Sequence, residues 1–127
     1  MTALPMALRG TVAHGDKRGR VLGFPTANLN CAAPLAYGVY ASKTRIAGGK
    51  KVWPSVTSYG TRPTFEGADH RIETHILDFA GDIYGCEIEV KLVAFIRPEL
   101  RFSSVDALVA AMQTDVEQAR ALIADAE

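Results

Sequence analysis

Hydrophobic and polar residues alternate in short runs over the first three quarters of the chain, as they do in strands with one buried face. The earlier runs predict strands at Ala7–Ala13, Val39–Ile46, Val52–Tyr59 and Ile72–Phe79. Pro34 and Gly38, which precede the second run, are typical of a turn.

The last alternating run predicts the clearest strand. Its apolar residues are expected to share one face, and its charged residues begin the other: Ile88, Val90, Leu92, Ala94 and Ile96 against Glu87, Glu89 and Lys91. The segment GDIYG at residues 81–85 separates this run from the preceding one. It predicts a hairpin connection between the two strands.

The hydrophobic period becomes helical near the C-terminus. The apolar stripe comprises Val105, Leu108, Val109, Met112, Val116, Ala119 and Ile123. Ser103 and Asp106 match a capping pattern at the start of this helix. Strands followed by one long helix, with no βαβ alternation, predict a small antiparallel barrel or sandwich rather than a Rossmann fold. We expect Val105, Leu108 and Met112 to be core residues.

Composition and charge narrow the class of protein. The 127 residues suit one domain, residues 1–127, and 48% hydrophobic with 22% charged residues suits a soluble globular fold. Fourteen basic and fourteen acidic residues give zero net charge, which argues against a nucleic-acid partner. The sequence has no apolar run of membrane-spanning length and no signal peptide, so we expect no membrane partner and a cytoplasmic location.

The two cysteines, Cys31 and Cys86, form neither a zinc nor a redox motif. Two reduced thiols are the simpler expectation, and a disulfide between them stays open. The common phosphate-binding and hydrolase motifs are also missing from the sequence. Gly15, Gly19 and Gly23 are spaced by four residues, which does not match the dinucleotide-binding pattern G-x-G-x-x-G.

The segment FPTAN at residues 24–28 offers a candidate metal site. In an extended chain Thr26 and Asn28 point to the same side, and their neutral oxygens are ligands that Mg²⁺ accepts beside substrate phosphates. Pro25 stiffens this presentation. Upstream, residues 15–20 supply backbone N–H groups and positive charge for a polyphosphate. The alternative is an ordinary turn followed by a polar strand start.

Glu73 is a carboxylate in the middle of a predicted strand, where it could accept a proton from a substrate hydroxyl. The alternative is an exposed carboxylate paired with Arg71 or a lysine. His75, on the same face, is interpreted as structural.

Two further segments combine glycine, arginine or proline with polar residues. GTRPTF at residues 60–65 is interpreted as a turn. RPELRF at residues 97–102 connects the last strand to the helix. Phe102 and the helix stripe could line a flat ring or form core.

Taken in order, "GTVAHGDKRGRVLGFPTANL", "GVYA", "GTRPTF", "IETHILDF", "DIYG" and "RPELRFSS" resemble the riboflavin kinase (flavokinase) family. The resemblance runs from about residue 8 to about residue 120. It implies a six-stranded antiparallel Greek-key barrel with a long C-terminal helix. It also implies transfer of the ATP γ-phosphate to the ribityl 5'-hydroxyl of riboflavin, which gives FMN and ADP.

The resemblance also implies roles for individual residues. Glu73 corresponds to the catalytic glutamate, and Thr26 and Asn28 to the ligands of Mg²⁺, for which Zn²⁺ or Mn²⁺ are alternatives. The nucleotide-binding residues implied are Gly15, Lys17, Arg18, Gly19, Arg20, Gly23, Pro25 and Thr26. The flavin-binding residues implied are Arg97, Glu99, Phe102 and Leu108.

Many bacterial members of this family carry an adenylyltransferase domain before the kinase domain. Because the kinase pattern begins almost at Met1, we expect this chain to make FMN and not FAD. We expect a monomer whose partners are riboflavin, FMN, ATP and ADP. The alternative function is a non-catalytic flavin-binding barrel.

Overall fold

A computed structural model describes residues 4–13, 27–29, 34–64, 67–79, 81, 83–100 and 102–125 of the chain. Its elements are β1 (Met6–Thr11), β2 (Ala27–Leu29), β3 (Gly38–Ile46), β4 (Val52–Thr64), β5 (Gly67–Ile76), β6 (Glu87–Arg97) and α2 (Val105–Asp125). The predicted mainly β class with a long C-terminal helix is therefore confirmed. All five strands predicted from alternation are present, with shifted ends.

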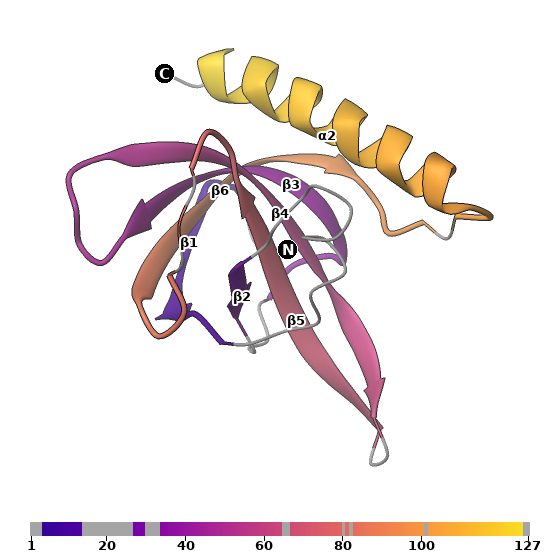
Figure 1. Cartoon of the computed structure of the whole chain (residues 1–127), viewed down its shortest axis with the longest axis horizontal. Helices are drawn as coiled ribbons and strands as arrows, with labels where there is room; N and C mark the ends of the chain where they lie inside the picture. Colours follow the sequence, from indigo (N-terminus) through magenta and orange to yellow (C-terminus); the bar gives the residue numbers. More distant parts are fainter. Residues whose placement is uncertain are drawn as a thin grey trace.

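The strands form one antiparallel sheet in the order β1-β6-β3-β4-β5-β2. The sheet curls on itself, and α2 lies across one side of it (Figure 1). Its two edge strands approach each other at an isolated bridge, where the Ala13 N–H donates to the Asn28 carbonyl at 2.8 Å. This bridge places the chain that follows β1 beside β2.

The concave face of the curled sheet holds the main hydrophobic core. Its fully buried members include Leu29, Ile72, Ile88, Val90 and Leu92. They come from β2, β5 and β6, so burial of these side chains holds together strands that are distant in sequence. Side chains alternate between the two faces along each strand, and this alternation puts these apolar residues on the same face.

Buried hydroxyl groups occupy another part of this face. Thr44, Ser55, Ser42, Thr57 and Thr74 form a continuous chain of hydrogen bonds between 2.6 and 3.0 Å across β3, β4 and β5. Because each of these buried hydroxyls has a neighbour, their desolvation is compensated.

The opposite face of the sheet packs against α2. Ala41 of β3 contacts Ala119 and Ile123 of the helix in a second, smaller cluster, and Val56 and Ala94 pack at its margin. The helix contacts β3, β4 and β6. This face also carries the candidate catalytic residues, as described below.

The expectation that one face of β6 carries all five apolar residues was wrong. The pairing of β3 with β6 shifts register between Ala41 and Ser42, whose partners are Ala94 and Leu92. Such an irregularity reverses the alternation on one strand. Ile88, Val90 and Leu92 therefore lie in the main core, while Ala94 and Ile96 pack under α2.

The predicted hairpin at residues 81–85 was also wrong, because β5 and β6 are not neighbours in the sheet. The connection instead packs against the end of β1. There the Val12 N–H donates to the Cys86 carbonyl at 2.9 Å, and the Gly85 N–H donates to the Val12 carbonyl at 3.0 Å. Non-local hydrogen bonds of this kind leave no mark in local alternation.

The helix begins one residue later than its predicted cap. Ser104, not Ser103, accepts a hydrogen bond on its Oγ from the Ala107 N–H at 3.1 Å. This is the bond expected of an N-cap. Val105 is 49% exposed and is not a core residue, because it begins the helix before the sheet covers it. Leu108 and Met112 are half-buried.

Residues 60–64, interpreted as a turn, continue β4, whose register with β5 extends to the pair Thr64 and Gly67. Phe65 lies outside the described residues. Cys86 is a free, half-buried thiol, and Cys31 lies outside the described part of the chain.

Candidate active site

Two of the predicted site residues meet directly across neighbouring strands. Asn28 of β2 lies opposite Glu73 of β5, and Glu73 lies opposite Ser58 of β4. Directly paired residues point to the same face, with Cβ atoms about 4.5–5.5 Å apart. The sheet therefore brings the amide of Asn28 and the carboxylate of Glu73 together, although 45 positions separate them in the sequence (73 − 28).

Asn28 is only 3% exposed, and its side-chain Oδ1 is buried without a hydrogen-bond partner. A buried acceptor of this kind costs about 1–3 kcal/mol unless something binds it. An oxygen held dry beside a carboxylate is suited to a cation. Asn28 therefore suits the role of metal ligand that its spacing from Thr26 predicts.

Arg71 lies on the same face of β5 as Glu73, two residues earlier. Its Nη1 is 3.7 Å from Oε1 of Glu73, so the pairing that was considered as the ordinary role of this glutamate does occur. The side chain of Arg71 is 15% exposed, and its Nε and Nη1 are buried without a hydrogen-bond partner. The guanidinium therefore has donors available for an anion beside Glu73.

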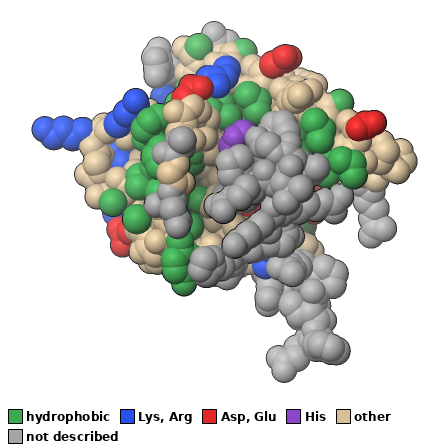
Figure 2. All heavy atoms as spheres, viewed as in Figure 1, with side chains coloured by type: hydrophobic (Ala, Val, Ile, Leu, Met, Phe, Trp, Pro, Cys, Tyr) green, Lys and Arg blue, Asp and Glu red, His purple; other side chains and the backbone are tan. Residues whose placement is uncertain are grey.

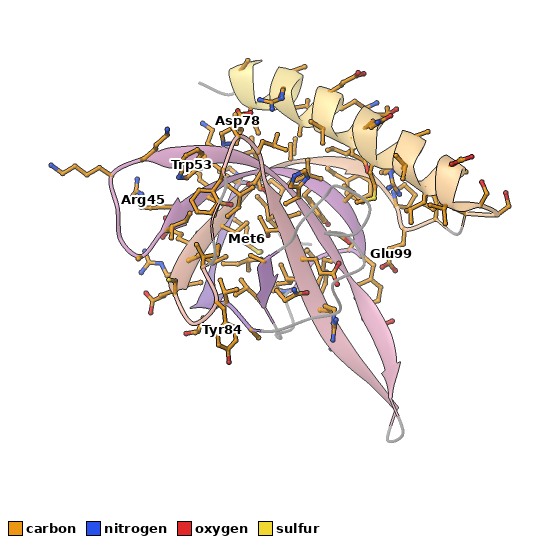
Figure 3. All side chains as sticks on the ribbon, viewed as in Figure 1. Met6, Arg45, Trp53, Asp78, Tyr84 and Glu99 are labelled. Carbon is orange, nitrogen blue, oxygen red and sulfur yellow. The ribbon has the colours of Figure 1, made fainter. Side chains whose placement is uncertain are left out.

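Glu99 reaches the same part of the sheet from the segment after β6. Its carboxylate lies over Gly60, where an added Cβ would collide with it. Gly60 is the cross-strand partner of Arg71. A side chain at position 60 would therefore displace Glu99 from the neighbourhood of Arg71 and Glu73. Figure 3 shows Glu99 near the beginning of α2.

Arg97, at the end of β6, is fixed by the helix. Its Nε and Nη2 donate to the two carboxylate oxygens of Asp115 at 2.9 and 2.8 Å. Its guanidinium also lies 5.5 Å from the centre of the Phe102 ring. Arg97, Phe102 and the helix start, which includes the half-buried Leu108, are thus one neighbourhood.

The two groups of predicted residues lie along one row of the sheet. Glu73 pairs with Ser58, Ser58 pairs with Val39, and Val39 pairs with Arg97. Three strand spacings separate the ends of this row, which is at most about 14 Å. A molecule with a reactive hydroxyl at one end and a flat ring at the other could span this row.

His75 continues the face that carries Glu73. Burial lowers the pKa of His75 below its usual value, and the charge of Arg120 lowers it further. Arg120 itself donates to both oxygens of Asp78 at 3.0 and 2.8 Å. A neutral histidine beside this ion pair agrees with the structural role expected for it.

The other predicted residues remain predictions. Thr26 and the nucleotide-binding residues Gly15, Lys17, Arg18, Gly19, Arg20, Gly23 and Pro25 lie outside the described residues. Figure 2 shows that a histidine side chain reaches the viewed face among the described hydrophobic side chains.

Sequence reasoning considered Arg71 only as a partner of Glu73 and missed Asp115 altogether. Arg71 had a usable signal, since a cation two residues from a mid-strand carboxylate shares its face. Asp115 had one as well, because it stands three positions after Met112 and four before Ala119, within the apolar stripe of the helix. A buried acid in such a stripe requires a partner.

A family model described as riboflavin kinase (flavokinase) matches residues 2–123 of the chain. The chain is 42% identical over 127 residues to a bifunctional riboflavin kinase/FMN adenylyltransferase of Listeria monocytogenes, with 97% of this chain and 40% of the relative covered. The chain thus spans about two fifths of the length of this curated relative.

Two solved structures resemble the fold. The crystal structure of a riboflavin kinase from Trypanosoma brucei has a TM-score of 0.68 and 26% identity, covering 92% of this chain and 76% of that one. A structure named macrolide-efflux protein from Streptococcus pneumoniae has a TM-score of 0.82 and 39% identity, covering 91% of this chain and 38% of that one. Among the described residues here, no helix is long and apolar enough to cross a membrane.

Proposed function

This chain belongs to the riboflavin kinase family, and we propose that it transfers the γ-phosphate of ATP to the ribityl 5'-hydroxyl of riboflavin, giving FMN and ADP. The observation that supports this most is the direct pairing of Asn28 with Glu73. A candidate metal ligand and a candidate proton acceptor then face the same small region, as phosphoryl transfer requires.

Asn28 would hold Mg²⁺ together with Thr26. The buried Oδ1 of Asn28 without a hydrogen-bond partner fits such a cation, because Mg²⁺ takes a small number of neutral or anionic oxygens from protein. When bound, the ion would neutralise charge on the nucleotide phosphates. The identity of the physiological metal belongs to this proposal, with Zn²⁺ or Mn²⁺ as alternatives.

Glu73 would orient the ribityl hydroxyl and accept its proton. An ordinary glutamate is ionised at neutral pH, so proton acceptance needs no special tuning. Phosphoryl transfer depends mainly on positioning and on stabilisation of charge at the transferred group. The open donors of Arg71, next to Glu73, are placed to stabilise that charge.

Riboflavin would lie along the row from Glu73 to Arg97. Its ring would border Phe102 and Leu108, and its ribityl chain would extend toward Glu73. Glu99, held over Gly60, would lie beside the chain between these ends. The ion pair of Arg97 with Asp115 would keep the ring-binding segment attached to α2.

A product assay with the chain, riboflavin, ATP and Mg²⁺ tests the proposed activity. We expect FMN and ADP in equal amounts, without FAD or pyrophosphate, because the residues recognised in this chain serve only the kinase step. Chromatography that resolves FMN from FAD measures the outcome. Flavin binding without any FMN would instead support a non-catalytic flavin-binding barrel.

Asn28→Ala should weaken the use of Mg²⁺-ATP more than the binding of riboflavin. The reason is that this oxygen is proposed to bind the metal and not the flavin. In a titration with Mg²⁺, this variant should need a higher metal concentration to reach half of its maximal initial rate. Ser58→Ala, which alters the neighbouring strand on the same face, is the matched control. An unchanged metal requirement in Asn28→Ala would remove Asn28 from the ligand set.

A further inference from the structure

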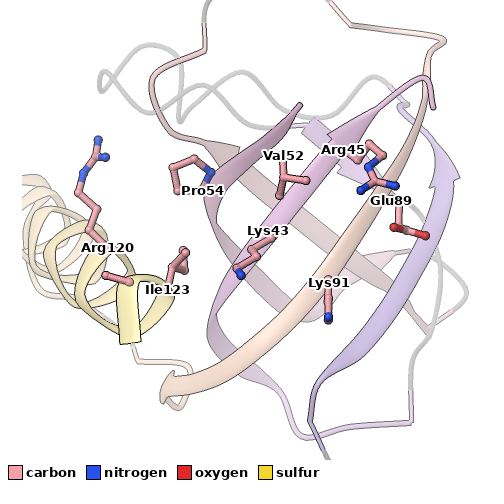
Figure 4. Close-up of a pocket in the computed structure, with 9 residues that line it drawn as sticks. Lys43, Arg45, Val52, Pro54, Glu89, Lys91, Arg120 and Ile123 are labelled. Carbon is pink, nitrogen blue, oxygen red and sulfur yellow. The ribbon is translucent and has the colours of Figure 1, made fainter. Parts of the chain in front are cut away.

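A second candidate site lies away from the row that holds Glu73. A groove of about 570 Å³ opens between the C-terminal part of α2 and the outer face of β3, β4 and β6. Lys43 and Lys91 lie on its sheet side, and Arg120 and Ile123 come from the helix (Figure 4). Its volume lies within the roughly 300–1,000 Å³ that small-molecule sites occupy.

Four cationic side chains line this groove, Lys43, Arg45, Lys91 and Arg120, and two of them form a cross-strand pair. Lys43 of β3 lies directly opposite Lys91 of β6. Like charges in this arrangement are destabilising, since their Cβ atoms are only about 4.5–5.5 Å apart. No ion pair joins either lysine to a carboxylate among the side chains that the structure describes.

Glu89 is the one carboxylate among the described residues that line the groove, and it already has a partner. Oε2 of Glu89 accepts a hydrogen bond from Nε of Arg9 at 2.7 Å and lies 2.6 Å from Nη2 of the same side chain in an ion pair. Asp78 is held by both terminal nitrogens of Arg120. Repulsion between Lys43 and Lys91 is thus left for a ligand or for solvent ions to relieve.

The groove also has an apolar side. Val52, Pro54 and Ile123 line it, and Val52 is 42% exposed. A ligand that contacts both sides of the groove would combine an anionic group with a compact apolar group. Lysine is a common phosphate ligand, acting as a point charge.

We propose that this groove binds a small organic phosphate. The phosphate lies between Lys43 and Lys91, and the apolar part of the ligand lies against Val52 and Ile123. This site is separate from the proposed kinase site. Lys43 stands four residues along β3 from Val39, which is about 13 Å of strand beyond the row of Glu73.

The test uses the whole chain, with phenyl phosphate and inorganic phosphate as separate probes in an NMR titration of backbone amides. Both probes should cause saturable shifts at residues 43, 91 and 123. Phenyl phosphate should bind about tenfold more tightly, if its ring buries roughly 55 Å² of apolar surface. Equal affinities, or shifts confined to the region of Asn28 and Glu73, would overturn the proposal.

Lys43→Gln/Lys91→Gln should weaken phenyl phosphate binding at the groove at least tenfold. The control variant Lys50→Gln/Lys51→Gln removes the same charge from the nearby β3–β4 connection and should bind as the unchanged chain does. An equal loss in both variants would show a general charge effect and refute the site. The single variants Lys43→Gln and Lys91→Gln, each with a several-fold loss expected, provide the same test with smaller changes.

The proposal does not depend on riboflavin kinase activity. Both double variants should retain the rate of FMN formation of the unchanged chain. Removing the lysine pair should leave thermal stability equal or slightly higher, because it removes a like-charge contact. A large fall in stability would show that Lys43 and Lys91 have structural partners and would contradict an open anion site.

Discussion

Glu73→Gln is expected to lower kcat for FMN formation by roughly 10²–10⁴-fold, the range for loss of a positioned general base. Glutamine keeps the shape of the side chain but cannot accept the proton of the ribityl hydroxyl. The cross-strand position opposite Asn28 is unchanged, so binding of riboflavin should change much less than kcat. Steady-state kinetics with a fluorescence titration of riboflavin measure the two effects separately.

Glu87→Gln is the matched control, because Glu87 is an exposed strand glutamate at the start of β6. It should leave both kcat and riboflavin binding unchanged. The melting temperature of Glu73→Gln should stay close to that of the unchanged chain, since the Glu73 side chain is 32% exposed and glutamine keeps its size and shape. Near-normal turnover in a folded Glu73→Gln variant would exclude this carboxylate as the base.

The local pattern of hydrophobic and polar residues predicted the strands and the helix better than it predicted which strands lie next to each other in the sheet. Alternation identified five strands and the helical stripe, because both periods are set by backbone geometry within one segment. It did not identify β2, which has only three residues, all buried. It could not show that β6 pairs with β1 and β3, because strand neighbours are chosen by packing of distant segments.

The irregularity in β6 shows the same limit at a smaller scale. Its five apolar residues follow strict alternation in the sequence, yet they divide between two clusters on opposite faces of the sheet. The register shift that divides them depends on how Ala41 and Ser42 of β3 pair with the strand. Sequence alternation alone contains no information about that partner.

The candidate site was predicted residue by residue but not as an arrangement. The residues and the family resemblance pointed to Asn28 and Glu73, and strand pairing placed them face to face. Two nitrogens of Arg71 lack a hydrogen-bond partner because the folded chain buries them. Asp115 requires a partner for the same reason, since the folded chain buries its carboxylate. Burial of a charged group follows from tertiary contacts, which explains why sequence reasoning gave these two residues no role in the site.

The helix offers a direct comparison of a buried and an exposed ion pair. Arg97 with Asp115 and Arg120 with Asp78 are both two-pronged contacts between α2 and the rest of the chain. The Asp115 side chain is 6% exposed, whereas the Asp78 side chain is 59% exposed. Hydrogen bonds from Arg120 hold the pKa of Asp78 below its usual value, but solvent screens this pair.

Asp115→Asn is therefore expected to destabilise the protein by about 2–3 kcal/mol, somewhat less than for a fully buried pair because Arg97 retains some contact with water. For a domain of this size the melting temperature should fall by roughly 6–15 °C. Asp78→Asn, the matched control, should change it little. Thermal unfolding followed by circular dichroism measures both, and similar losses in the two variants would contradict the importance of burial.

The same substitution should also affect the flavin end of the proposed site. Without Asp115, Arg97 loses the contact that holds the end of β6 and the segment with Phe102 against the helix. We expect KM for riboflavin to rise several-fold while kcat changes less, because Glu73 and Asn28 lie three and four strands away from Arg97. Arg97→Met/Asp115→Leu should recover much of the stability, since an apolar pair can replace a buried ion pair. If the double variant is stable but still binds riboflavin weakly, Arg97 contributes to flavin binding itself; if binding returns with stability, its role is to position the segment.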